Sequence, residues 1–206
     1  MVGIAWIEFV GQGLLTMKEW LLMRNVLRTA AAAAALALTL LTAPQATAQE
    51  SPSSDRRIAG TSVPLSEKGA GDARTRAIAE DDPEAVTATA TLCGSGYELE
   101  YAERLPDARR YGTLFTYTKF SAGSSGVCAL FDNNTSGAKR MKLKLCPNKT
   151  GATCKVDEGT FSRYAGPVKY EDSSGRYVQC SMVSALMWDA NGKVLIDRVT
   201  SATLCD

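Results

Sequence analysis

The chain of 206 residues contains no histidine. Histidine is the general base of Ser-His-Asp and Cys-His active sites and a ligand in nearly all catalytic zinc centres, so its absence argues against these classes of enzyme. Cysteine ligation of a metal is disfavoured as well, because no Cys-x-x-Cys pair occurs in the sequence. We therefore expect a protein with no cofactor and no metal site.

An excess of charge of either sign is also missing. The whole chain has 23 basic and 22 acidic residues and a formal net charge of +1. Residues 1–48 hold three of the basic and two of the acidic residues, which leaves 20 of each in residues 49–206. Affinity for nucleic acids and for anionic membranes depends on clustered Lys and Arg. The sequence therefore predicts no nucleic-acid partner and no polybasic membrane anchor.

The N-terminal region, residues 1–48, has the layout of a secretory signal peptide. A basic stretch at 23–28 precedes an apolar run at 29–41, and the small residues at 46–48 form a cleavage site before Gln49. The apolar run is shorter than the ~20 residues of a comfortable transmembrane helix. We expect cleavage before Gln49 and a secreted protein that keeps no stable membrane anchor.

The first residues, 1–16 or 1–22, do not fit this layout, because Glu8 interrupts their apolar run and no basic residue precedes it. Met17 and Met23 are alternative start sites. We interpret the preceding stretch as a start assigned too far upstream. An uncleaved signal anchor is the competing interpretation.

The segment that follows, residues 49–92, is poor in large apolar side chains. It contains no Phe, Tyr, Trp or Cys and mixes Gly, Ala and Ser with charged residues. Such a composition buries too little apolar surface to offset the entropy that is lost on ordering. We predict a disordered spacer, in which a short helix over 74–85 is the alternative for one part.

All six cysteines lie in residues 93–206, and an even number in an exported domain of this size indicates a disulfide framework. Two of them are eight residues apart and can close one loop, whereas two others flank the domain and would join its ends. The remaining two lie in apolar segments that we interpret as strands. The predicted pairs are Cys146 with Cys154, Cys93 with Cys205, and Cys128 with Cys180.

Residues 93–206 contain short apolar, β-branched and aromatic runs, separated by turns rich in Gly, Ser, Asn and Asp. This pattern is typical of strands, and Asn191-Gly192 predicts a hairpin with a type I′ turn. We predict an all-β domain, a small disulfide-stapled antiparallel β-sandwich or open barrel. The expected strands cover 97–103, 114–120, 127–131, 141–145, 177–183 and 194–196.

Two sequence blocks point to a known family. A Cys-Gly-Ser-Gly-Tyr block opens the domain at 93–97, and a Tyr-Ala-Gly-Pro-Val block occupies 164–168. With four of the cysteines in order around these blocks, the region 93–206 resembles the spore-associated protein A group of small secreted actinomycete proteins. The long spacer and the two extra cysteines, Cys146 and Cys154, depart from that group. The resemblance implies export and association with the spore or cell surface, and it implies no reaction.

We therefore interpret the chain as a non-catalytic secreted protein of the spore or cell surface, with surface or cell-wall components as its partners. Its oligomeric state is not indicated by the sequence. Exposed aromatic residues could stack on sugar rings of the envelope, although we expect Trp188 and Phe161 to be buried. The aromatic candidates for such a platform are Tyr111, Tyr164, Tyr170, Tyr177 and Trp188.

Two alternatives use other parts of the domain. The loop closed by Cys146 and Cys154 presents Pro147, Asn148 and Lys149, and a rigid loop of this kind suits an inhibitor of a trypsin-like protease. A hydrolase would instead need two carboxylates that face one cleft. By residue type alone, its candidates are Glu98, Glu100, Asp107, Glu171, Asp172 and Asp189.

Overall fold

The computed structural model of the protein describes residues 56–58, 60–203 and 205. The predicted signal peptide, residues 1–48, lies outside the described residues, as does the beginning of the predicted spacer. The described residues all belong to one compact unit, which spans 49–206. In this part of the chain, no helix combines the length and the hydrophobicity that a bilayer span requires.

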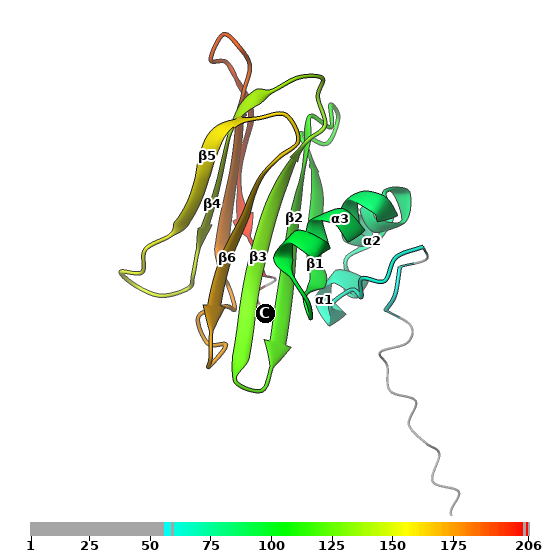
Figure 1. Ribbon diagram of the computed structural model, residues 1–206, viewed down its shortest axis with the longest axis vertical. Helices are drawn as coiled ribbons and strands as arrows, with labels where there is room; N and C mark the ends of the chain where they lie inside the picture. The colour runs from blue at the N-terminus through cyan, green and yellow to red at the C-terminus, as the bar shows by residue number, and fades with distance from the viewer. Residues whose placement is uncertain (1–55, 59, 204, 206) are drawn as a thin grey trace, which may run out of the picture. The chain divides into compact units, whose positions relative to one another are not determined.

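Two antiparallel four-stranded sheets pack against each other, and this β-sandwich confirms the predicted fold class (Figure 1). The strands are β1 (Glu98–Leu105), β2 (Gly112–Ser121), β3 (Ser124–Asn133), β4 (Lys139–Cys146), β5 (Lys155–Phe161), β6 (Tyr164–Asp172), β7 (Met182–Trp188) and β8 (Val194–Ser201). The first sheet has the order β1-β2-β3-β6 and the second has the order β5-β4-β7-β8. Five of the six predicted strands coincide with strands of the fold; the exception is 177–183, most of which forms turns. β5, β6 and most of β7 lie outside the predicted strands.

The predicted hairpin between β7 and β8 is confirmed, but its turn is not type I′. Among the residues of the turn only Gly192 has a positive φ, of 79°. The carboxylate of Asp189 accepts hydrogen bonds from the amides of Asn191 and Lys193, both at 2.9 Å. The Asp189 side chain therefore organises a longer turn, in which a single glycine takes the left-handed conformation.

The prediction of a disordered spacer is wrong for its second half, which forms three short helices. They are α1 (Glu67–Gly71), α2 (Ala73–Asp81) and α3 (Pro83–Cys93). Ser66, Asp72 and Asp82 cap their N-termini, each accepting a hydrogen bond from a backbone N–H of the first turn. Pro83 fits the first position of α3, where its missing N–H costs nothing.

These helices cover the outer face of the first sheet, on the side away from the second sheet (Figure 1). Ile78 and Val86 are buried in the same apolar cluster as Phe115 and Leu130, which project from β2 and β3. The helices contribute mostly small apolar groups, and the sheet supplies the large ones. The helices of the spacer are ordered because their apolar side chains pack against the large apolar side chains of the sheet. The composition of the spacer alone does not reveal this contact.

A second apolar core lies between the two sheets. Leu114 and Phe131 of the first sheet join Leu143 and Met187 of the second sheet, and all four side chains are fully buried. β2 and β3 are therefore buried on both faces: β3 has a continuous apolar run at 127–131, and β2 mixes threonines with large apolar residues. β4 and β7 are buried on one face only, which explains their alternating sequences.

Only one of the three predicted disulfides is correct. The structure confirms Cys146–Cys154, but it pairs Cys93 with Cys128 and Cys180 with Cys205, in place of Cys93 with Cys205 and Cys128 with Cys180. Cys93 ends α3 above β3, where Cys128 faces the helices. Cys180 lies in turns with a φ of 57°, close to the C-terminal segment, which donates a hydrogen bond from Ala202 to the carbonyl of Ser181.

The Tyr-Ala-Gly-Pro-Val block lies in β6, where it interrupts the pairing with β3. Gly166 has a φ of 101°, and a Cβ atom there would lie 2.8 Å from the carbonyl oxygen of Ala129. The register shifts between Ala129 and Phe131 on the facing strand. Glycine is required at this irregularity because both the conformation and the close approach exclude a side chain.

The carboxylate of Glu103 ties the three layers together. It accepts hydrogen bonds from Arg74 of α2 at 2.9 Å, from Arg198 of β8 at 2.7 Å and from Tyr101 of β1 at 2.6 Å. Glu103 is buried, at 7 % exposure, so the hydrogen bonds compensate for the loss of water around its charge. The open side of the sandwich between β1 and β8 is closed by these contacts.

Candidate functional site

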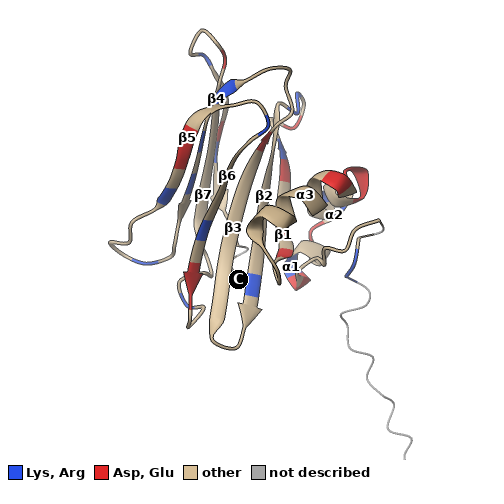
Figure 2. Cartoon of the chain, in the orientation of Figure 1, with Lys and Arg blue, Asp and Glu red and all other residues tan. Residues whose placement is uncertain are grey.

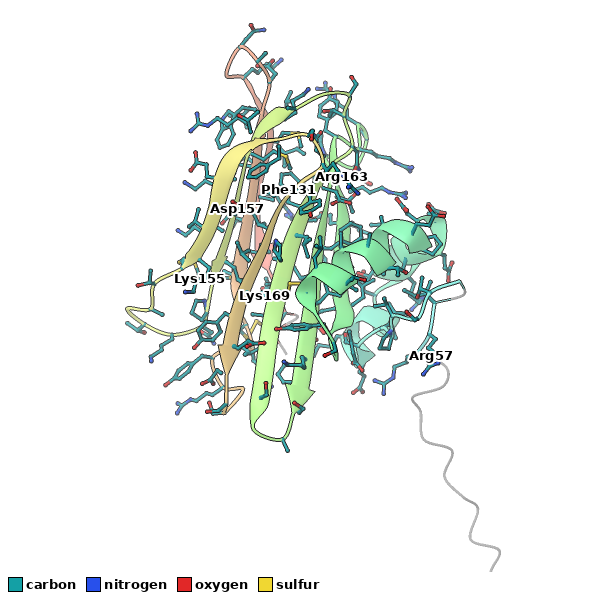
Figure 3. All side chains as sticks on the ribbon, viewed as in Figure 1. Arg57, Phe131, Lys155, Asp157, Arg163 and Lys169 are labelled. Carbon is teal, nitrogen blue, oxygen red and sulfur yellow. A yellow bond between two sulfur atoms is a disulfide. The ribbon has the colours of Figure 1, made fainter. Side chains whose placement is uncertain are left out.

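A cleft of about 570 Å³ lies between α3 and the adjoining ends of β3 and β6. One wall is the exposed side of α3, and the other is formed by the end of β3 with the turn between β5 and β6, where Figure 3 labels Arg163. Its volume falls within the range of ligand pockets, roughly 300–1,000 Å³. Lining side chains from the two walls include Asp82, Glu84, Leu92, Asp132, Arg163 and Tyr164.

The walls of this cleft are fixed by contacts between distant parts of the chain. The Cys93–Cys128 disulfide joins the end of α3 to β3, and the ammonium group of Lys169 donates a hydrogen bond to the carbonyl of Cys93 at 2.7 Å. Along α3, the hydroxyl of Tyr117 donates a hydrogen bond to the carbonyl of Val86 at 3.0 Å. The cleft is thus a built feature of the fold.

Asp132 is the chemically distinctive residue of the cleft. Its side chain lies on the helix-facing side of the first sheet, in register with Thr113 of β2 and Tyr164 of β6. It is half-buried, and it accepts no hydrogen bond and forms no ion pair with any residue that the structure describes. The pKa of Asp132 is raised from 3.8 to about 6: burial is the largest cause, the charge of Asp82 also raises the pKa, and Arg163 partly opposes both by lowering it.

The raised pKa of Asp132 has a consequence for stability. A proton binds the folded protein more tightly than the unfolded chain, so this residue adds stability that is complete below about pH 4 and is lost as the pH rises through about 6. Above that pH, the ionised carboxylate lowers the free energy of unfolding by an amount on the order of 1–3 kcal/mol. The fold therefore keeps an unpaired carboxylate at an energetic cost.

Negative charge predominates in the cleft. Asp82 and Glu84 stand at the beginning of α3, within the acidic region that Figure 2 shows between α2 and α3. Arg163 is the one basic residue of the lining, against three carboxylates. None of the carboxylates named from the sequence as hydrolase candidates lines this cleft. Asp132 and Asp82 are not among those candidates, because the sequence around Asp132 predicts a turn and the sequence around Asp82 predicts a solvated acidic run.

The six carboxylates predicted as hydrolase candidates do not converge on one site. Glu98 and Glu100 line a smaller hollow of about 260 Å³ beside α1, whereas Glu171 binds Tyr97 and Lys119 at another place. Asp172 accepts a hydrogen bond from the hydroxyl of Ser174, and the Asp189 carboxylate is used by its turn. Asp107 is exposed in the connection between β1 and β2.

The three predicted contact residues of the loop closed by Cys146–Cys154 differ in their exposure to solvent. Pro147 is buried, whereas Asn148 and Lys149 are exposed. The ammonium group of Lys149 lies 5.0 Å from the ring centroid of Tyr177. Backbone hydrogen bonds from Lys149 to Pro147 at 2.8 Å and from Ala152 to Lys149 at 3.1 Å make this a loop of tight turns. The geometry presents no extended segment around Lys149.

The outer face of the second sheet is a second candidate surface, because the helices lie against the first sheet (Figure 1). Register places Lys144 between Val156 and Ser184, and Val199 beyond Ser184, in one row across the four strands. Val156 is 50 % exposed and Val199 is 56 % exposed. We call this row the aliphatic strip: it has an exposed valine at each end, with Lys144 and Ser184 between them.

Trp188 lies at one end of this face rather than in the core. It is half-buried, and the guanidinium group of Arg140, its neighbour across β4, lies 4.7 Å from the ring centroid. Arg140 and Lys142 both pair with Glu158, at 2.7 Å and 2.9 Å. Phe161 is also only half-buried, so the expectation that both aromatic residues would be buried is wrong.

The other aromatic candidates do not gather into a platform. Tyr111 and Tyr170 pack partly against the core between the sheets, and Tyr164 packs against the core under the helices. Tyr177 is covered by Lys149. Among the described residues, no group of three or more His, Cys, Asp or Glu side chains is arranged to hold a metal ion. The chain matches no protein family, no curated protein and no solved structure.

Proposed function

We propose that this is a non-catalytic, exported protein that associates with the surface of the spore or cell through the outer face of its second sheet. The partner is an anionic glycan of the envelope. The resemblance to the spore-associated protein A group supports this assignment, and so do the three disulfides, since such bonds persist outside the reducing cytoplasm.

The observation that carries the proposal is the exposure of the second sheet's outer face. Four of the five large apolar residues that are exposed in the described chain lie in β5, β7 and β8, so exposed apolar side chains are concentrated on the second sheet. These four residues are Val156, Met182, Val194 and Val199. A flat, aliphatic strip beside a tryptophan can contact the apolar faces of sugar rings.

The charges of this face favour an anionic partner. β4 projects Arg140, Lys142 and Lys144 outward, and Glu158 is engaged by the first two. Asp197 of β8 is a second carboxylate on this face, so the cations still exceed the carboxylates by three to two on these strands. Lys144 forms no ion pair with any described residue, and its only neighbours across the strands are Val156 and Ser184. Lys144 is therefore free to pair with a phosphate or carboxylate of the glycan, while the valines contact its sugar rings.

Retention on purified cell wall tests this proposal. Lys144→Glu places a carboxylate in the middle of the aliphatic strip, so we expect retention to fall roughly tenfold at low salt, because attraction becomes repulsion. Arg109→Glu makes the same charge change in the connection between β1 and β2 and serves as the matched control. It should retain nearly the wild-type affinity.

Two results would contradict the proposal. One is that the wild-type protein does not bind to purified cell wall that still carries all its anionic polymers. The other is equal loss of retention in the Lys144→Glu and Arg109→Glu variants, which would show that only total charge matters. Removing the anionic polymers from the wall should reduce retention of the wild type to the level of Lys144→Glu.

A further inference from the structure

We propose that the cleft beside α3 binds a small ligand with a primary ammonium group, which pairs with the Asp132 carboxylate while the carbon body of the ligand contacts Tyr164 and Leu92. This inference concerns a different face of the molecule from the proposed surface association, and neither depends on the other. The cleft volume of about 570 Å³ suits a ligand of the size of a monosaccharide or a substituted aromatic ring.

The state of the Asp132 carboxylate gives the reason for a donor in the ligand. A carboxylate that is largely removed from water normally accepts hydrogen bonds or forms an ion pair. Asp132 has neither among the described residues, although it lines a cleft large enough for a ligand. An ammonium group in the cleft would supply both a charge and hydrogen-bond donors to the half-buried Asp132 carboxylate, which has neither among the described residues.

The charge of the whole lining favours a cation over a neutral donor. Asp82 and Glu84 face the cleft from α3, Asp132 faces it from β3, and Arg163 faces it from the turn before β6. The three carboxylates exceed the single guanidinium group, so the potential in the cleft is negative at neutral pH. The carboxylates do not converge as metal ligands in the described structure, which favours an organic cation.

The remaining lining suits the carbon atoms of such a ligand. Ala85, Ala88 and Leu92 follow one another along the exposed side of α3 and form an apolar strip. Tyr164 lies on the opposite wall, in register with Asp132, so its ring stands beside the carboxylate. A ligand that pairs with Asp132 would therefore have its body between an aliphatic wall and an aromatic wall.

Affinity should depend on the ionisation of Asp132. The groups that face it are Asp82 and Glu84 on α3, Arg163 at the turn, and the neutral Thr113, Tyr117 and Tyr164 on the neighbouring strands. Because the pKa of Asp132 is about 6, the carboxylate is ionised at neutral pH and becomes protonated as the pH falls to about 5. An ammonium ligand keeps its charge over this range, so binding should weaken on acidification.

The test is titration calorimetry on the mature chain, residues 49–206, with two amines and their uncharged counterparts. Glucosamine is compared with glucose, and benzylamine is compared with benzyl alcohol, so the two pairs distinguish a sugar amine from a simple aryl amine. At about pH 7, where both amines are largely protonated, we expect at least one amine to bind roughly tenfold more tightly than its counterpart, and this preference should fall several-fold near pH 5.

Variants separate the cleft from other acidic sites. Asp132→Asn should lower amine affinity at least about tenfold, because it keeps the shape and removes the charge. Asp107→Asn, which removes an exposed carboxylate outside the cleft, should leave the affinity unchanged. Arg163→Gln removes the only lining cation and should strengthen binding of the same amine, which a fold defect would not do.

Thermal unfolding checks that these variants fold, and Asp132→Asn should be at least as stable as the wild type at neutral pH because the uncompensated charge is gone. The proposal is overturned if neither amine binds, if amine and counterpart bind equally, or if Asp132→Asn leaves the affinity unchanged. Amine binding in the Lys144→Glu variant should equal that of the wild type, so failure of this inference and failure of the surface association give different results.

Discussion

A chain shortened to residues 93–206 is expected to lose cooperative unfolding and to aggregate. The truncation removes the helices and exposes the outer face of the first sheet, where Leu99, Phe115 and Leu130 are buried to 1 % exposure or less. Each large apolar side chain contributes about 1.5–3 kcal/mol when it is buried. The loss from several such residues therefore matches or exceeds the 5–15 kcal/mol that is typical for the net stability of a whole domain.

Urea unfolding followed by circular dichroism measures this effect. The matched control is a chain of residues 56–206, which keeps the helices and lacks only what precedes them, and it should unfold in one transition. A chain of residues 93–206 that unfolds cooperatively at a similar urea concentration would contradict the structural role of the helices.

Replacing both cysteines of the Cys93–Cys128 bridge with alanine should lower the free energy of unfolding by about 4 kcal/mol. The bridge closes a loop of 35 residues, and the loss follows from the greater freedom of the unfolded chain. Both cysteines are buried in the cluster under the helices, so the bridge also fixes the end of α3 on β3. Urea unfolding under oxidising conditions measures the difference.

The matched control is removal of the Cys146–Cys154 bridge, which closes a loop of eight residues and should cost about 2.5 kcal/mol by the same relation. A smaller loss for the Cys93–Cys128 variant than for this control would contradict the assigned role of the longer bridge. Loss of the amine affinity in the Cys93–Cys128 variant would accompany the loosening of α3, because that helix forms one wall of the cleft.

The strands of the sandwich could be predicted because their sequences follow local patterns. β4 alternates basic and apolar residues, and Asn191-Gly192 marks the hairpin between β7 and β8. The helices were missed because the segment lacks aromatic residues, although two signals were present. Asp72 and Asp82 have the identity of helix caps, and the continuous apolar run of 127–131 requires cover on both faces of β3.

The disulfide pairs could be predicted only where sequence distance decided them. Cys146 and Cys154 are neighbours on a loop, so their pairing needs no knowledge of the fold. The partner of Cys93 depends on where α3 ends above the sheet, and the partner of Cys180 depends on a turn in a segment where the sequence predicts a strand. Both pairs follow from tertiary contacts that no local pattern contains.

The cleft could not be predicted for the same reason. Asp132 stands in a run of turn-forming residues, and its sequence neighbours give no sign that α3 lies across from it. The chemistry of Asp132 comes from partial burial by a helix that begins about fifty residues earlier and from the absence of a hydrogen-bond donor to it among the described residues. The sequence shows that position 132 is an aspartate, but the raised pKa of its carboxyl group follows only from the fold.

The most direct test of the account is peptide mapping, without reduction, of the protein recovered from outside the cells. The account predicts three linked peptide pairs, which join Cys93 to Cys128, Cys146 to Cys154 and Cys180 to Cys205. It would be contradicted by peptides that join Cys93 to Cys205, or by six free thiols in a protein that is found only in the cytoplasm.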